Sequence, residues 1–139
     1  MIEVFILNSL VVAFAVLIHY EMLFRMSLVI PKLRLKHHFR VVFGIFGALV
    51  AHVIEIWMFA LVYYYMHLSG KFGFLTGKFT SSMLDCVYFS FVTYTSLGLG
   101  DISPVGEIRF LTGLEALTGL VLITWTASFM FIEMQKFWK

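Results

Sequence analysis

The chain has 139 residues, of which 61% are hydrophobic and only 13% are charged, and its mean hydropathy is +0.95. A soluble core of this length would need more polar surface to cover it, so the composition predicts a single-domain integral membrane protein. The formal net charge of +2 includes no polybasic arm, so we expect no nucleic-acid partner. The single cysteine, Cys86, cannot form an intrachain disulfide.

The first apolar segment covers residues 2–23. A helix of about 20 residues spans a hydrocarbon core of about 30 Å, so this segment is the first predicted transmembrane helix. Residues 25–40 form a linker in which Pro31 argues against a continuous helix. The linker carries Lys32, Arg34, Lys36, His37, His38 and Arg40. By the positive-inside rule this solvated basic loop is cytoplasmic and the N-terminus is outside, and anionic lipid headgroups can bind at Arg34, Lys36 and Arg40.

The second apolar segment, residues 41–66, contains His52 and Glu55. Three tyrosines close it, Tyr63, Tyr64 and Tyr65, and are predicted to form an aromatic belt at the outer membrane interface. Residues 67–81 are polar and glycine-rich, which indicates an external loop.

Residues 82–94 are apolar but too short to span a membrane. Ser82 and Asp85 have the spacing of a capping box, which would begin a helix there. A short helix followed by a glycine-containing polar strand is a re-entrant element, which protein or a water-filled cavity must surround. Residues 108–134 form the last predicted span, and the lysines after it indicate a cytoplasmic C-terminus. The sequence therefore predicts a multi-pass protein of the cell membrane with the polar strand facing outward.

The stretch 93–104 is the only run dense in Thr, Ser, Gly and Asp, and it lies between two long apolar segments. Within it, residues 96–101 read Ser-Leu-Gly-Leu-Gly-Asp. This string resembles the filter Thr-Val-Gly-Tyr-Gly-Asp of the potassium-channel pore-domain family, and the likeness covers the last third to half of the chain. The resemblance implies a small prokaryotic-type subunit of a pore-loop cation channel. Residues 1–40 would be an extra N-terminal transmembrane helix with its basic linker, and residues 41–139 would be the pore domain.

The implied fold is all-α, with three transmembrane helices plus a re-entrant pore helix and filter, assembled as a homotetramer. The implied function is passive potassium conduction, with K⁺ as the permeant ligand, no organic cofactor and no enzymatic activity. Two substitutions, Ser96 for Thr and Leu99 for Tyr, leave a weakly selective monovalent cation channel open as an alternative. A regulatory subunit that keeps the pore fold without conducting is also open.

By this resemblance the ion-binding filter is Ser96, Leu97, Gly98, Leu99 and Gly100, and the carbonyls of the first four are the K⁺ ligands. Successive carbonyls can face one axis only if the backbone alternates in hand, and glycine adopts the left-handed positions at least cost. Asp101 would lie at the outer mouth and raise the local cation concentration. The C-terminal end of the pore helix would turn its carbonyl dipoles towards the ion.

Gly119 lies close to the position at which the inner helix of this family often bends, and a packing role for this glycine is the alternative. If Gly119 is the hinge, Ile123 and Met130 are candidates for the cavity wall and gate.

Charged groups within spans should face protein or water. Counted from the ends of their spans, Glu55 and Glu115 lie at similar depth, with His52 one turn from Glu55. We therefore expect a polar cluster of His52, Glu55 and Glu115 that supports the filter near Thr93, Tyr94 and Thr95. Separate partners for each group are the alternative. His19-x-Glu21 and His52-x-x-Glu55 also resemble metal-ligand pairs, but each lacks a third ligand on its element. The two histidines are predicted to lie at different depths, which favours structural roles.

Overall fold

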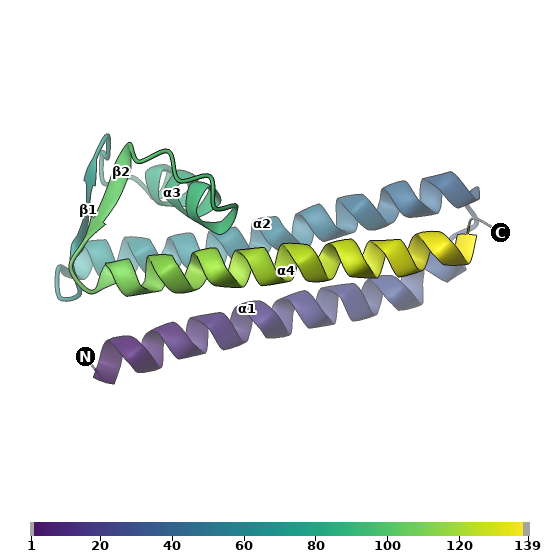
Figure 1. Cartoon of the computed structure of the whole chain (residues 1–139), viewed down its shortest axis with the longest axis horizontal. Helices are drawn as coiled ribbons and strands as arrows, with labels where there is room; N and C mark the ends of the chain where they lie inside the picture. The colour runs from purple at the N-terminus through teal and green to yellow at the C-terminus, as the bar shows by residue number, and fades with distance from the viewer. Residues whose placement is uncertain (1, 138–139) are drawn as a thin grey trace.

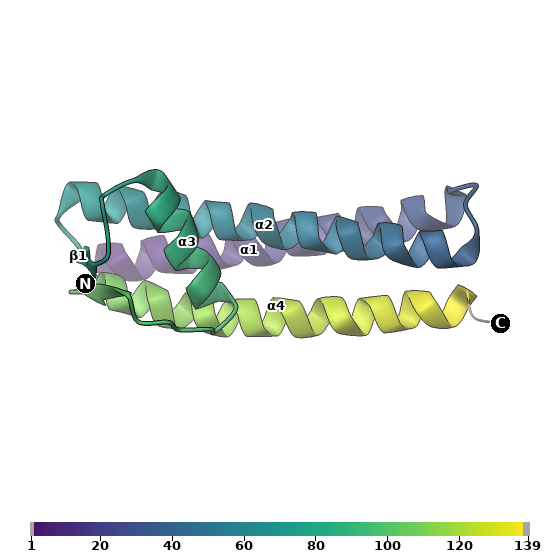
Figure 2. The same cartoon turned by 90° about the horizontal axis from the view of Figure 1, so that it is seen from above.

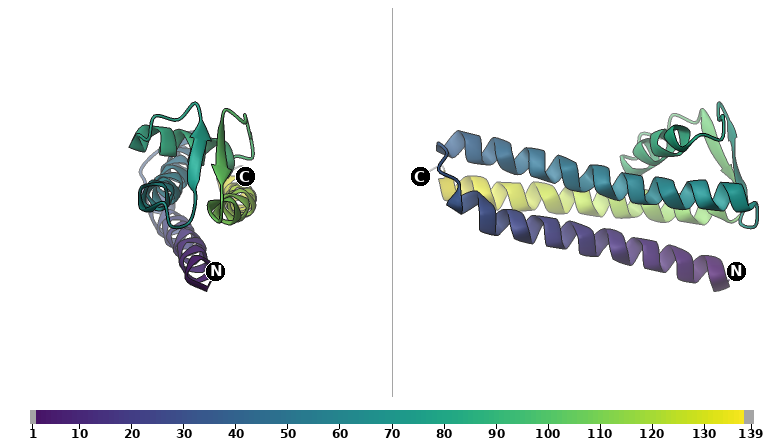
Figure 3. Two further views of the ribbon diagram at one scale, coloured as in Figure 1. Left: turned by 90° about the vertical axis from the view of Figure 1, so that its left-hand side faces the viewer. Right: turned by 180° about the vertical axis from the view of Figure 1, so that it is seen from behind.

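Three long helices run side by side along one axis in the computed structural model, which describes residues 2–137 (Figures 1 and 3). They are α1 (Ile2–Val29), α2 (His37–Ser69) and α4 (Ile108–Phe137). All three are long and apolar enough to cross a membrane. The three predicted spans are therefore confirmed, and each is longer than the sequence suggested.

The connection between α1 and α2 is much shorter than the predicted loop of residues 25–40. A 3₁₀ turn, Ile30–Lys32, extends α1 and places Pro31 in its first turn, where a missing N–H costs little. The backbone of Lys36 is extended and caps α2, so His37, His38 and Arg40 belong to the first turns of that helix. Only residues 33–36 connect the two helices. The predicted linker of residues 25–40 was therefore wrong at both ends, since residues 25–32 extend α1 and residues 37–40 begin α2.

A two-stranded antiparallel sheet that the sequence did not predict, the β1–β2 sheet, closes the opposite end of the helices. Strand β1 (Phe74–Gly77) pairs antiparallel with β2 (Ile102–Val105), so part of the predicted external loop is extended chain. Glycine is required at Gly77, whose φ is +98° and where a Cβ would lie 2.2 Å from the carbonyl oxygen of Asp101. The pairing ties the segment before the short helix to the segment after the filter.

The short helix α3 (Met83–Tyr94) lies across α2 and α4, on the side opposite α1 (Figures 1 and 2). The Ser82 hydroxyl accepts a hydrogen bond from the Asp85 N–H at 3.1 Å, which confirms the predicted N-terminal cap. The Asp85 carboxylate accepts bonds from the N–H and the hydroxyl of Thr80, at 2.7 and 2.6 Å. These bonds, the hydroxyl bond first, hold the pKa of Asp85 below its usual value.

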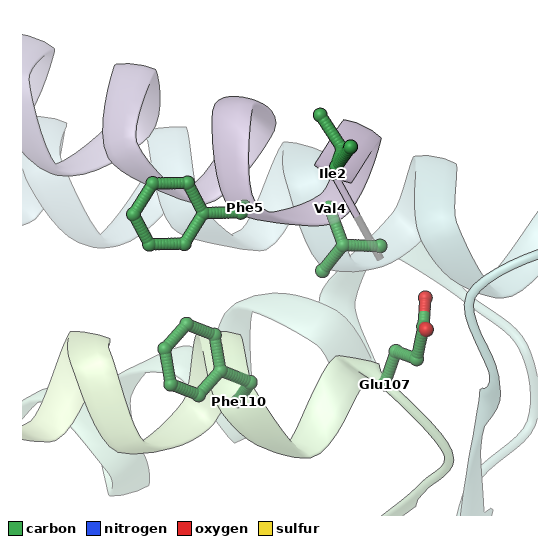
Figure 4. Close-up of a pocket in the computed structure, with 5 residues that line it drawn as sticks. All are labelled: Ile2, Val4, Phe5, Glu107 and Phe110. Atoms are coloured by element: carbon green, nitrogen blue, oxygen red, sulfur yellow. The ribbon is translucent and has the colours of Figure 1, made fainter.

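α1 diverges from α4 at the end where the β1–β2 sheet lies (Figure 3). An apolar cavity of about 430 Å³ separates the two helices there, and Phe5 and Phe110 face each other across it (Figure 4). From this end onward, α1 packs through a stripe of buried residues at helical spacing, which includes Val4, Asn8, Val11, Ala15 and His19.

The filter and the buried polar networks

The backbone after α3 alternates in hand along the predicted filter. Ser96, Gly98 and Gly100 have φ values of 58°, 58° and 78°, and the residues between them do not have positive φ. Gly98 and Gly100 thus adopt the left-handed conformation expected of them, and Ser96 does so without being glycine. In an extended chain, such alternation turns successive carbonyls towards one side, which is the arrangement that a ring of backbone ligands around an ion requires.

The amides at the start of this strand point back to the end of α3. The N–H of Ser96 donates to the Thr93 carbonyl, and the N–H of Leu97 donates to the Val92 carbonyl, both at 2.9 Å. These bonds satisfy carbonyls of the last helical turn, and the N–H of Gly98 also donates to the Val92 carbonyl, at 3.3 Å. Because the donors face the helix, the strand is anchored from behind.

Two side chains hold the outer and inner ends of the strand to α3. The Tyr88 hydroxyl donates to the Asp101 carboxylate at 2.9 Å. The Thr95 hydroxyl donates to the Phe91 carbonyl at 2.7 Å, which fixes its side chain on the last turn of the helix. Leu97 and Leu99, by contrast, are 63% and 60% exposed in a single chain.

Glu55 lies at the centre of a network to which every helix contributes. His19 Nδ1 of α1 lies 2.9 Å from Glu55 Oε1, and the Tyr94 hydroxyl of α3 donates to Glu55 Oε2. His52 Nδ1 lies 3.3 Å from Glu55 Oε2 and 2.9 Å from the Tyr94 hydroxyl. Thr126 of α4 completes the network, because its Oγ1 contacts Nε2 of both histidines. Tyr94 is the last residue of α3, so this network supports the base of the filter.

Glu115 belongs to a second network. It accepts a bond from the Tyr63 hydroxyl at 2.6 Å and another from the Ser90 hydroxyl. None of the contacts described for residues 2–137 joins Glu115 to His52 or Glu55, so the predicted three-residue cluster was wrong in that part. The depth estimate brought the two carboxylates to a similar height, since Ser90 donates both to Glu115 and to the carbonyl of Ile56, the neighbour of Glu55. Counting along a helix does not give the direction of a side chain about the helix axis, and Glu115 turns to Tyr63 and Ser90 instead.

Sequence reasoning also misplaced or missed four members of these networks. His19 was predicted to lie at another depth than His52, yet the two ring centroids are 5.2 Å apart. Tyr63 was assigned to an interfacial belt but is fully buried. Ser90 and Thr126 carried no signal that distinguishes them from other small polar residues within an apolar helix. The one sequence pattern that could have indicated this position of His19 is its helical spacing from small residues such as Ala15 on the same face of α1.

Gly119 is a packing site against the end of α3. A Cβ there would lie 2.1 Å from the carbonyl oxygen of Tyr94, and α4 continues as one helix past this position. Of the two alternatives left open, the contacts support packing. Ile123 and Met130 line a groove of about 440 Å³ together with His52, Tyr94 and Thr126.

Comparison with known proteins gives the class. The model of a family described as "Ion channel" matches residues 51–136, which is more than half of the chain. The chain belongs to this family, the pore-loop cation channels of potassium-channel pore-domain type, and it is a membrane protein. The match leaves α1 outside. No curated protein and no solved structure matches the chain.

Proposed function

We propose that four copies of this chain surround one axis and conduct potassium passively through the strand that follows α3. The ion ligands are the carbonyls of Ser96, Leu97, Gly98 and Leu99, and Gly100 ends the filter. The observation that carries the proposal is the alternation of positive φ at residues 96, 98 and 100. A dehydrated monovalent cation needs a ring of oxygens, and one chain supplies only one strand of it.

Exposure of the leucines supports the tetramer. Leu97 and Leu99 are more than half exposed in one chain. A filter must be rigid, and exposed side chains do not hold the backbone in place. Apolar side chains at alternate positions of a strand gain free energy by packing against a neighbouring copy. In the assembled pore they face away from the axis, while the carbonyls face it.

We infer the polarity of the subunit from its charges. Arg34 and Lys36 lie at the turn between α1 and α2, which supports a cytoplasmic location for that end by the positive-inside rule. These residues and Arg40 are the sites for anionic headgroups. The β1–β2 sheet and Asp101 then lie outside, where the Asp101 carboxylate concentrates cations at the mouth of the pore.

The test is cation flux into liposomes that contain only the purified protein. We expect potassium flux in the wild type and loss of flux in Gly98→Ala. A non-glycine residue in the left-handed conformation costs about 1–2 kcal/mol per chain, hence about 4–8 kcal/mol for four chains. Gly113→Ala is the matched control, because a Cβ at that position meets nothing within 4 Å. Absence of flux in the wild type would favour the non-conducting regulatory subunit.

A weakly selective cation channel is the second candidate, and Leu99 favours it. Leucine has no hydroxyl with which to hold the width of the filter by a hydrogen bond. The reversal potential in mixed potassium and sodium separates the two candidates. A value near the potassium equilibrium potential supports potassium selectivity, and a value near zero supports the weakly selective pore. Leu99→Tyr should then move the reversal potential towards that of potassium.

A further inference from the structure

His19, His52 and Glu55 form a set of potential metal ligands that sequence spacing could not reveal. One nitrogen or oxygen atom of each residue lies within 4.8 Å of the others. His19 comes from α1, whereas the other two come from α2. His19 and Glu55 are fully buried, inside helices that are long enough to span a membrane. An unpaired ionised group at such a place is expensive, so the set needs a compensating charge.

Thr126 constrains where the protons of the two histidines lie. Its Oγ1 lies 3.2 Å from His19 Nε2 and 3.0 Å from His52 Nε2. A hydroxyl can donate one proton and accept two. Thr126 therefore accepts from both rings, or accepts from one ring and donates to the other. In either arrangement at least one neutral ring turns an Nδ1 lone pair towards the Glu55 carboxylate.

This arrangement leaves a place for a cation. When both rings are neutral and both donate to Thr126, the network carries the negative charge of Glu55, and both Nδ1 lone pairs face its carboxylate, at 2.9 and 3.3 Å. Neutral imidazole nitrogens plus one carboxylate are the donors that zinc prefers. We propose that this channel binds one zinc ion between His19, His52 and Glu55.

The three ligand atoms lie within 4.8 Å of one another, so a tetrahedral ion requires them to move somewhat closer together. Zinc–ligand bonds of about 2.0–2.1 Å place neighbouring ligand atoms about 3.3 Å apart. The Tyr94 hydroxyl lies 2.9 Å from His52 Nδ1 and is a candidate for the fourth ligand, directly or through a water. With zinc on both Nδ1 atoms, both Nε2–H groups donate to Thr126. Such an outer hydrogen-bond acceptor orients the ligating histidines in zinc proteins.

The ion has a route to the site. His52, Tyr94 and Thr126 line the groove of about 440 Å³ between α2, α3 and α4. The His52 side chain is 14% exposed there, whereas the other two ligands are not exposed. His52 is therefore the one of the three ligands that an ion in the groove can contact directly.

Zinc in this position links α1 to the pore domain. His52 and Glu55 lie within the residues that the ion-channel family model matches, and His19 lies outside them. Through His19, the bound ion would hold α1 next to Tyr94, the last residue of α3. The site does not depend on which cation the filter conducts, so its test is independent of the proposed function.

The experiment measures zinc in the purified full-length protein after exposure to zinc and removal of excess ion. We expect about one zinc ion per chain in the wild type and at least a tenfold loss of affinity in His19→Gln and Glu55→Gln. Thr126→Val leaves all three ligands and the charge in place, and should weaken zinc binding about 10–100-fold by removing the shared acceptor. His38→Gln is the control, because His38 is exposed on the first turn of α2.

Cobalt(II) provides the spectroscopic readout, because a four-coordinate site gives it strong visible absorption that an adventitious surface ion lacks. We expect that absorption in the wild type and in His38→Gln, and its loss in His19→Gln. Zinc retention by His19→Gln and Thr126→Val equal to that of the wild type would overturn the proposal, as would a wild type that retains no zinc. Loss of zinc in Cys86→Ser with retention in His19→Gln would also overturn it.

Discussion

Gly119→Ala should destabilise the channel because the new methyl group would meet main-chain atoms. An ideal Cβ at Gly119 lies 2.1 Å from the carbonyl oxygen of Tyr94, and ordinary contact begins at 3.4 Å, so α3 and α4 must separate by about 1.3 Å. Rotation of a side chain cannot relieve this clash. Overpacking costs about 1–3 kcal/mol, and the backbone neighbour places this site near 3 kcal/mol. Alanine recovers about 1 kcal/mol of helix propensity, which leaves a net loss of about 2 kcal/mol.

Gly113→Ala supplies the comparison on the same helix. Nothing lies within 4 Å of a Cβ at Gly113, so only the propensity term acts, and the variant should gain about 1 kcal/mol. Reversible unfolding in mixed micelles, followed by intrinsic fluorescence, gives both free energies. Because the propensity term is common, the two variants should differ by the overpacking cost of about 3 kcal/mol. Equal stabilities would refute the close approach of α4 to Tyr94, and with it the packing role of Gly119.

Three further predictions test the supports of the filter. Ser90→Ala removes a donor from the buried carboxyl group of Glu115 and should cost about 1–3 kcal/mol of unfolding free energy; an unchanged value would contradict the second network. Asp85→Asn should lower stability at neutral pH, because the native pKa of Asp85 lies below its unfolded value. That stabilisation is complete above the unfolded pKa and is lost as pH falls through the native one, so thermal melts of variant and wild type should converge only in acid. Gly77→Ala should break the β1–β2 pairing, since a Cβ at residue 77 would lie 2.2 Å from the backbone oxygen of Asp101, and hydrogen exchange of the amides in β1 and β2 should increase.

The spans, the short helix and the filter could be predicted because each has a local signal. Apolar length marks a membrane helix regardless of its partners, and the Ser82 cap depends on residues three apart. The left-handed positions at Gly98 and Gly100 likewise follow from residue type. The β1–β2 sheet had no such signal, because β1 precedes α3 in the sequence and β2 follows it, so their pairing depends on how the chain folds back.

Side-chain partners within the membrane could not be predicted for a related reason. In α1 most residues are apolar and apolar residues lie on every face, so hydrophobic periodicity does not distinguish the face with Ala15 and His19 from the lipid-facing residues. Depth counted along a helix gives height but not rotation about its axis. The sequence therefore grouped Glu115 with Glu55, whereas the helices turn Glu115 to Tyr63 and Glu55 to His19.

Asn8 gives a test of how α1 packs against the other helices. Its side chain is fully buried, and neither amide atom has a hydrogen-bond partner among residues 2–137. A buried polar group without a partner costs about 1–3 kcal/mol, so Asn8→Leu, which is similar in size, should stabilise the protein by about that amount. Ser9→Leu on the exposed side of α1 adds similar hydrophobicity without touching the interface, and should change the unfolding free energy less. If Asn8→Leu instead destabilises the protein, the Asn8 amide has a hydrogen-bond partner in the folded chain, and α1 does not pack against the other helices as described.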